Sequence, residues 1–137
     1  MIVADTGALI ALIDRAERNH ATLRALYQET ADEWVLPWAV LPEVDYLLGA
    51  HVGKPAQRAF LEDLADGALP VVWGSEEDLD AAHRLLAQYK SLDFGLVDAV
   101  VMATATRLRA RAIATLDIRH FGAVKIPGEP KLFPRDL

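Results

Sequence analysis

The chain has 137 residues, of which 53% are hydrophobic, and a formal net charge of −6 at pH 7. A chain of this length is expected to form one domain and to bury about two-thirds of the surface that its unfolded form exposes. It has no cysteine, which excludes disulfides, thiolate metal sites and cysteine nucleophiles. No apolar run approaches the roughly 18 residues of a membrane span, and the start Met1–Asp5 lacks the pattern of a signal peptide. We therefore expect a soluble, cytoplasmic protein without membrane contact.

Strands and helices alternate along the first half of the chain. Residues 2–4 are a short apolar run that predicts a central strand, and an apolar helix follows over residues 8–13. Asn19 can cap a second helix over residues 20–30. The next elements are a strand over residues 34–36, stopped by Pro37, a helix over about 39–50, which needs Pro42 in its first turn, and a helix over 55–64.

The second half continues the alternation. Ser75 is followed by three acids, which is typical of a helix start, and that helix is expected to reach about Tyr89. The other predicted elements are strands over 69–73, 112–115 and 132–133 and a helix over 96–109. This pattern predicts a single α/β domain over residues 1–137, with a central parallel sheet flanked by helices. In such sheets, ligands bind beyond the carboxyl ends of the strands.

Four acids occur where a carboxylate needs a special reason. Asp98 stands in the first turn of a helix that is apolar almost all round, and an unpaired charge there would cost several kcal/mol or take up a proton. Asp5 and Asp117 each follow a predicted strand, and Glu43 lies near the start of its own helix. Each has an ordinary alternative as a cap or as a first-turn acid. If the fold brings them together, a hard divalent cation such as Mg²⁺ or Mn²⁺ is the expected compensation.

A pair of such cations would suit phosphodiester chemistry, because two ions about 4 Å apart can activate water and stabilise the leaving oxygen. The charge distribution permits a nucleic-acid substrate. Residues 104–137 carry seven basic and three acidic side chains, whereas residues 1–103 carry seven basic and 17 acidic ones. A polyanion could meet the basic end of an otherwise acidic protein. Helix ends and tails often carry Arg and Lys for no such reason, so charge alone leaves both readings open.

The four acids and their flanking residues resemble a known family. The chain resembles a PIN-domain ribonuclease, and more narrowly a VapC toxin of a bacterial type II (VapBC) toxin–antitoxin module, in the segments Asp5-Thr6, Pro42-Glu43, Leu96-Val97-Asp98-Ala99 and Thr115-Leu116-Asp117-Ile118-Arg119-His120-Phe121. The resemblance extends from Val3 to about Phe121 in the order and at the length of the family. Each segment alone is a weak signal, and the four together are a strong one.

The resemblance implies a Mg²⁺- or Mn²⁺-dependent endoribonuclease that cleaves structured cellular RNA, either tRNA or rRNA, by metal-activated water. It also implies a cognate VapB-type antitoxin and a homodimer. Asp5, Glu43, Asp98 and Asp117 match the catalytic, metal-binding quartet of the family. Asp5 and Asp98 are the expected direct metal ligands, and Glu43 and Asp117 are expected to bind directly or through water.

Further residues match or depart from the family pattern. Thr6 and Thr115 match hydroxyl positions that would orient a carboxylate or a bound water. Gly7 stands where many relatives have Ser, and Thr106 replaces an acid that is common in that helix. Asp93 is interpreted as a loop or cap residue, with a supporting role in the site as the alternative.

Three arginines are candidate RNA contacts. Arg107 and Arg111 are predicted to share a helix face and to bind the RNA backbone, with a solvated helix end as the equal alternative. Arg119 follows Asp117 and is a candidate phosphate contact. Of the four histidines, only His120 lies near the proposed site, and it is expected to support its loop. The tryptophans Trp34, Trp38 and Trp73 border strands, which favours core packing over base stacking.

The sequence leaves two other functions open. A small metal-dependent phosphohydrolase is one alternative, but dehalogenase-type phosphatases need a second Asp where this chain has Gly7, and the acid pair of a phospho-accepting receiver is not evident. A catalytically silent PIN-like module that binds RNA or protein is the other. The presence of all four acids favours the enzyme.

Overall fold

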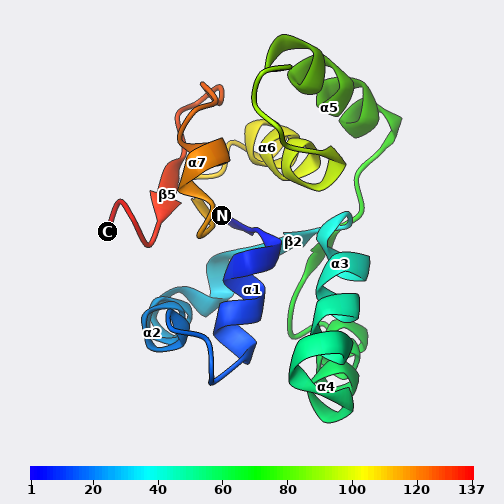
Figure 1. The fold of residues 1–137 in the computed structure, drawn as a ribbon, viewed down its shortest axis with the longest axis vertical. Helices are drawn as coiled ribbons and strands as arrows, with labels where there is room; N and C mark the ends of the chain where they lie inside the picture. Colours follow the sequence, from blue (N-terminus) through cyan, green and yellow to red (C-terminus); the bar gives the residue numbers. More distant parts are fainter.

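The computed structural model describes all residues from Met1 to Leu137, which form a five-stranded sheet with helices on both faces (Figure 1). The strand order is β3-β2-β1-β4-β5, and every neighbouring pair is parallel. The strands are β1 Ile2–Ala4, β2 Trp34–Pro37, β3 Val71–Val72, β4 Ala112–Ala114 and β5 Lys131–Phe133. The predicted α/β class with a central parallel sheet is therefore confirmed.

Strand β1 is the central strand because its side chains are wholly apolar and are fully buried. Its Ile2 lies opposite Trp34 of β2, and its Ala4 lies opposite Ala114 of β4. Parallel neighbours reach the same edge of the sheet at their carboxyl ends. Asp5 and Thr115, which directly follow β1 and β4, are therefore neighbours at that edge.

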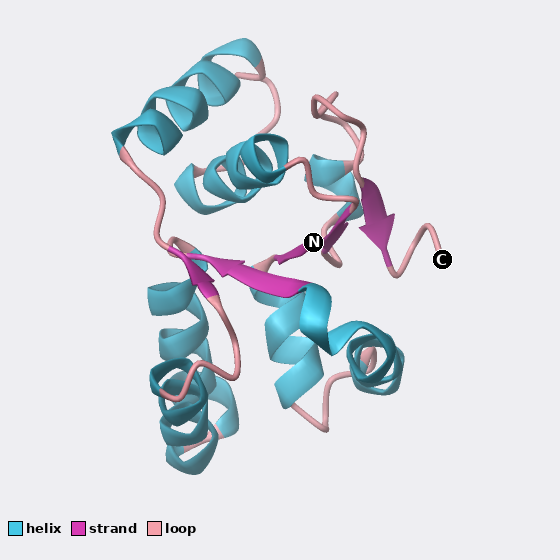
Figure 2. Cartoon of the chain, turned by 180° about the vertical axis from the view of Figure 1, so that it is seen from behind, coloured by secondary structure: helices cyan, strands magenta, loops and turns pink.

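The helices form a layer on each side of the sheet. In Figure 2 the helices α5 and α6 lie on one side of the sheet and α1 to α4 on the other. The bounds are α1 Thr6–Ile13, α2 His20–Thr30, α3 Val40–Leu47, α4 Lys54–Ala65, α5 Glu76–Gln88, α6 Leu96–Leu108 and α7 Ile118–Phe121, with a π-helical turn at Leu48–Val52. None of these helices has the length and apolar character needed to cross a membrane.

Helix α6 is the buried helix that the sequence predicts. Seven consecutive residues, Ala99–Ala105, are buried, so the helix packs on all sides and holds its first turn in a fixed place. It ends at Leu108 because Arg109 adopts a left-handed conformation (φ 50°, ψ 46°). The predicted common helix face for Arg107 and Arg111 is therefore wrong, since Arg111 lies beyond the helix.

Three further expectations differ from the structure. The helix predicted over 39–50 ends at Leu47, and the chain continues in the π-helical turn. The strand predicted over 69–73 is reduced to Val71–Val72, because Pro70 has no N–H to donate and Gly74 turns the chain with φ 73°. Trp73 is consequently 72% exposed and does not pack in the core, whereas Trp34 is buried as expected.

Candidate active site

Asp5 lies at the carboxyl end of β1 and is almost completely buried, with 5% of its surface exposed. It is the N-cap residue of α1, and its Oδ1 accepts a hydrogen bond of 2.9 Å from the backbone N–H of Thr6. Burial raises the pKa of Asp5 to about 7, against the lowering effect of hydrogen bonds from Thr115 and Thr6. The negative charges of Asp98 and Asp117 contribute to this rise. Asp5 is thus a buried acid under the influence of two further acids, Asp98 and Asp117.

Thr115 connects Asp5 to the next strand end. Its hydroxyl donates to Asp5 Oδ2 over 2.8 Å and accepts from the backbone N–H of Asp117 over 3.0 Å. Thr115 is fully buried after β4, so this hydroxyl has little freedom to turn. It therefore fixes the carboxyl of Asp5 relative to the backbone that carries Asp117.

Asp98 projects from the first turn of α6, where 23% of its side chain is exposed. Burial raises the pKa of Asp98, the charge of Asp117 raises it further, and His120 opposes the rise. Asp98 and Asp117 thus lie close enough to repel each other when both are ionised. The helix that the sequence identifies as buried places its single acid beside the strand ends.

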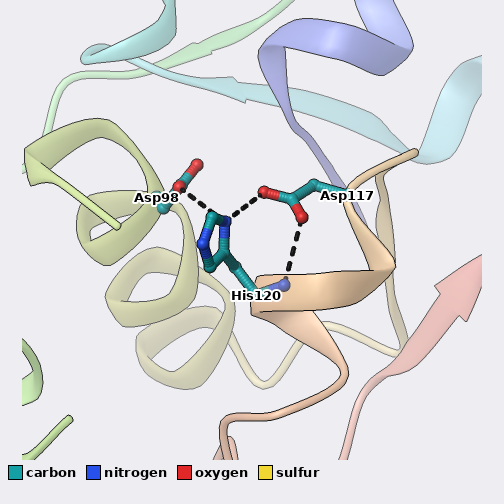
Figure 3. A group of neighbouring side chains, drawn as sticks. All are labelled: Asp98, Asp117 and His120. Carbon is teal, nitrogen blue, oxygen red and sulfur yellow. Dashed lines mark hydrogen bonds and ion pairs between the residues drawn. The ribbon is translucent and has the colours of Figure 1, made fainter. Parts of the chain in front are cut away.

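Asp117 and His120 face each other across one turn of chain (Figure 3). Asp117 is the N-cap of α7, and its Oδ1 accepts the backbone N–H of His120 at 3.1 Å. Its Oδ2 lies 2.8 Å from His120 Nδ1, and the same ring nitrogen lies 4.0 Å from Asp98 Oδ2. One ligand atom from each of Asp98, Asp117 and His120 lies within 4.8 Å of the others.

Glu43, the fourth acid of the predicted quartet, comes from a different helix. It lies in the first turn of α3, directly after Pro42, and its side chain is exposed. After burial and Asp117, the charge of Glu43 also raises the pKa of Asp98. Glu43 is thus an exposed acid whose charge acts on the half-buried Asp98.

The residues at this sheet edge fit a hard divalent cation. Most of the donors are carboxylate and hydroxyl oxygens, which Mg²⁺ and Mn²⁺ prefer, and His120 Nδ1 is the nitrogen beside them. The Thr6 hydroxyl is buried next to Asp5 and has no hydrogen-bond partner in the protein, which leaves one more oxygen available for a bound group or its water. A cation would also favour the ionised forms of Asp5 and Asp98, whose pKa values burial and mutual repulsion raise.

The structure gives the predicted RNA contacts different environments. Arg107 forms a two-pronged ion pair with the buried Asp78 of α5, with its Nε 3.0 Å from Asp78 Oδ1. Arg111 forms a similar pair with Glu33 and lies over the ring of Phe133. Arg119 is exposed in α7, between Asp117 and His120, and forms no ion pair. Of the three arginines, Arg119 is therefore the one whose charge no acid of the chain neutralises.

The structure shows the surroundings of Asp93 and His120, whose roles the sequence pattern does not decide. Asp93 is exposed in the loop before α6 and forms no hydrogen bond, and the N-cap of that helix is Gly95. His120, by contrast, contacts the acids directly. Its spacing of three residues from Asp117 was the available signal, because a cap residue and the third residue after it meet in the first turn of a helix. The sequence did not predict the short helix α7, so this spacing could not be read as a contact.

An apolar cavity has none of the four predicted site acids in its lining. It has a volume of about 680 Å³ between α3, α4 and β3, and its walls include Trp38, Leu41, Phe60, Leu64 and Trp73. Asp45 is the only charged residue in its lining. Since this lining offers no group of ligands or general acids, the carboxylate cluster remains the candidate active site.

Comparison with known proteins agrees with the α/β fold described above and identifies its family. The PIN domain family matches residues 2–126. The chain is 36% identical over 124 residues to ribonuclease VapC26 of Mycobacterium tuberculosis. These aligned residues make up 90% of this chain and 92% of that protein.

Solved structures share the architecture at lower sequence identity. The crystal structure of VapC20 of Mycobacterium tuberculosis, named as a toxin that cleaves the sarcin–ricin loop, aligns with a TM-score of 0.83 and 20% identity over 93% of this chain and 98% of that one. A toxin–antitoxin complex from Klebsiella pneumoniae aligns with a TM-score of 0.71 and 20% identity over 93% and 94% of the two chains. With the match over residues 2–126 and the 36% identity to VapC26, this chain belongs to the PIN-domain family and is a relative of the VapC proteins within it.

Proposed function

We propose that this protein is a divalent-metal-dependent endoribonuclease and the toxin of a type II toxin–antitoxin module. The observation that carries the proposal is that Asp5, Asp98 and Asp117 lie at one edge of the sheet. The charges of Asp98 and Asp117 add to the effect of burial in raising the pKa of Asp5. The 36% identity to a ribonuclease over most of the chain supports the same activity.

The four acids would bind Mg²⁺ or Mn²⁺ together. Asp5 and Asp98 would bind the ion directly, while Glu43 and Asp117 would bind directly or through water. The bound ion would supply an activated water and neutralise charge that develops on the phosphate. Thr115 keeps the carboxyl of Asp5 in place through its 2.8 Å hydrogen bond, and Thr6 offers its unpaired hydroxyl beside it.

The exposed Arg119 would contact a phosphate of the RNA next to the scissile bond. It directly precedes His120 and is not engaged by any acid of the chain. Arg107 and Arg111 stay secondary candidates, because their ion pairs with Asp78 and Glu33 already use their guanidinium groups. The substrate class is structured cellular RNA, either tRNA or a loop of rRNA. The structural similarity to a toxin that cleaves the sarcin–ricin loop makes that loop the first rRNA substrate to test.

The partners follow from the same family. An antitoxin of the VapB type would bind and neutralise the protein, as the toxin–antitoxin complex with the same fold suggests. A homodimer is also proposed, and the site of action would be the cytoplasm, where the substrate RNA and the antitoxin are made.

Substitution of two acids tests the proposal. In Asp98→Asn and Asp5→Asn, the loss of one carboxylate charge should abolish Mn²⁺-dependent cleavage of total RNA, while circular dichroism shows an unchanged fold. Asp14→Asn is a matched control, because Asp14 lies at the other end of α1 and the variant should cut at the wild-type rate. If the wild type binds RNA without cutting it, the protein is a silent binding module; if Asp98→Asn cuts normally, the site is elsewhere.

A further inference from the structure

One residue holds both carboxylate oxygens of Asp117. The backbone N–H of His120 donates to Asp117 Oδ1 over 3.1 Å, and the His120 ring reaches Oδ2 through Nδ1 over 2.8 Å. In the tautomer that carries its proton on Nδ1, the ring donates this second hydrogen bond to Asp117. Two donors from a single residue leave the carboxyl of Asp117 little freedom to rotate.

His120 is itself fixed from two sides. Its neighbour Phe121 is buried in the core and anchors α7. The ring of Phe94, from the loop before α6, lies with its centroid 6.0 Å from the imidazole centroid at an angle of 49°. Only 17% of the His120 side chain is exposed. The imidazole therefore has a defined orientation with Nδ1 towards Asp117 and Asp98, as the sticks in Figure 3 show.

We propose that His120 is a positioning residue of the metal site, which acts by holding the carboxyl of Asp117 towards Asp98 through Nδ1. This inference rests on the proposed function, since it concerns the same site. Groups that orient a ligating carboxylate or imidazole affect metal affinity, and their removal typically costs about 10- to 100-fold. The alternative role is that of a nitrogen ligand. It is disfavoured because Nδ1 already donates to Asp117 and because Mg²⁺ and Mn²⁺ prefer oxygen ligands.

Mn²⁺ titration of purified variants, followed by electron paramagnetic resonance without RNA, tests the inference. His120→Asn places an N–H donor at the position of Nδ1 and should keep the Mn²⁺ affinity within about 3-fold of the wild type. His120→Gln places its N–H donor at the position of Nε2 and should lose about 10- to 100-fold, as His120→Ala should. His83→Ala is the matched control, because His83 is exposed on α5 and its removal should leave the affinity unchanged.

The pair His120→Asn and His120→Gln separates positioning from a mere effect on folding, because both side chains are polar amides. Melting of the metal-free variants provides a second readout and should differ little between these two. The inference is overturned if His120→Ala binds Mn²⁺ as the wild type does, or if His120→Gln restores binding and His120→Asn does not. It is also overturned if bound Mn²⁺ shows the nitrogen coupling of a directly attached imidazole that His120→Asn removes. Wild-type protein that binds no Mn²⁺ would instead refute the proposed function, and the inference with it.

Discussion

Asp5 is buried at the end of β1, and its hydrogen bonds offset only part of the free-energy cost of burying a charged carboxylate. Burial, together with the charges of Asp98 and Asp117, raises its pKa to about 7 even though Thr115 and Thr6 donate to it. Without a cation, the folded protein therefore holds a proton on Asp5 that the unfolded chain releases at much lower pH. The protonation of this single residue links folding to the state of the site.

The metal-free protein should lose stability as the pH rises from 4 to 7. The folded state keeps the Asp5 proton up to about pH 7, whereas the unfolded chain releases it near 3.8. The folded state binds more protons between these values, so the free energy of unfolding falls with rising pH, by about 1.4 kcal/mol per unit. Urea unfolding in chelator at pH 5 and pH 8 should show a loss of about 2–3 kcal/mol in the wild type relative to Asp5→Asn. Equal pH dependence in the two proteins would show that Asp5 is ionised throughout.

The hydroxyl of Thr115 should prove more important than its size suggests. Thr115→Val keeps the shape but removes the donor to Asp5 and the acceptor for the Asp117 N–H, so it should lower the free energy of unfolding by about 1–3 kcal/mol. The Mn²⁺ affinity should fall with it, while Thr115→Ser, which keeps the hydroxyl, should retain both. Denaturant unfolding and Mn²⁺ titration measure the two effects. A Thr115→Val protein that matches the wild type in both would exclude this bridge from the site.

At the scale of elements, an ion pair fastens α5 onto α6. Asp78 of α5 is only 2% exposed, and its carboxylate accepts from Nε and Nη2 of Arg107 as well as from the backbone N–H of Ser75. Removal of the cation would leave a buried carboxylate without compensation. Because α6 carries Asp98, the packing of these two helices also supports the position of a site residue. Arg107 therefore has a structural role in the packing of α5 on α6.

Arg107 and Arg119 should therefore respond differently to removal of their charge. Arg107→Ala should lower the free energy of unfolding by about 2 kcal/mol or more, whereas the exposed Arg119→Ala should change it by less than about 0.5 kcal/mol. Arg119→Ala should instead weaken RNA binding and reduce the salt dependence of log K by about one unit. Unfolding curves and RNA binding in the Asp98→Asn background measure both. A stable Arg107→Ala protein with weakened RNA binding would reverse the two roles.

The sequence predicted the elements whose signals are local. Asp5 and Asp117 follow apolar runs, and the apolar surroundings of Asp98 predicted a buried helix, so these three positions could be derived before the structure was known. The partners of Arg107 and Arg111 lie 29 and 78 residues away, and no pattern along the chain predicts such pairs. The contact of His120 depends on α7, which has only four residues and too little periodicity to be recognised. The exposure of Trp73 depends on where the edge strand β3 ends.

At the scale of the whole molecule, the topology creates the site. β1 and β4 are neighbours in the sheet, although more than a hundred residues separate Asp5 from Thr115 in the chain. The helix α6 precedes β4 and returns Asp98 to the same edge, and α3 brings Glu43 from beside β2. The acids thus come from four separate segments of the chain, and the parallel sheet with its crossover helices is what brings them together. The fold therefore determines most of the geometry of the site, whereas the local sequence shows only which residue types occur there.

The central claim is that these acids hold a divalent cation that RNA cleavage requires. Its most direct test is the rate of RNA cleavage by purified protein after chelation and after return of Mn²⁺ or Mg²⁺. We expect no cleavage in excess chelator, full recovery when either ion is added back, and no recovery in Asp98→Asn. Cleavage by the wild type at an undiminished rate in excess chelator would contradict the account.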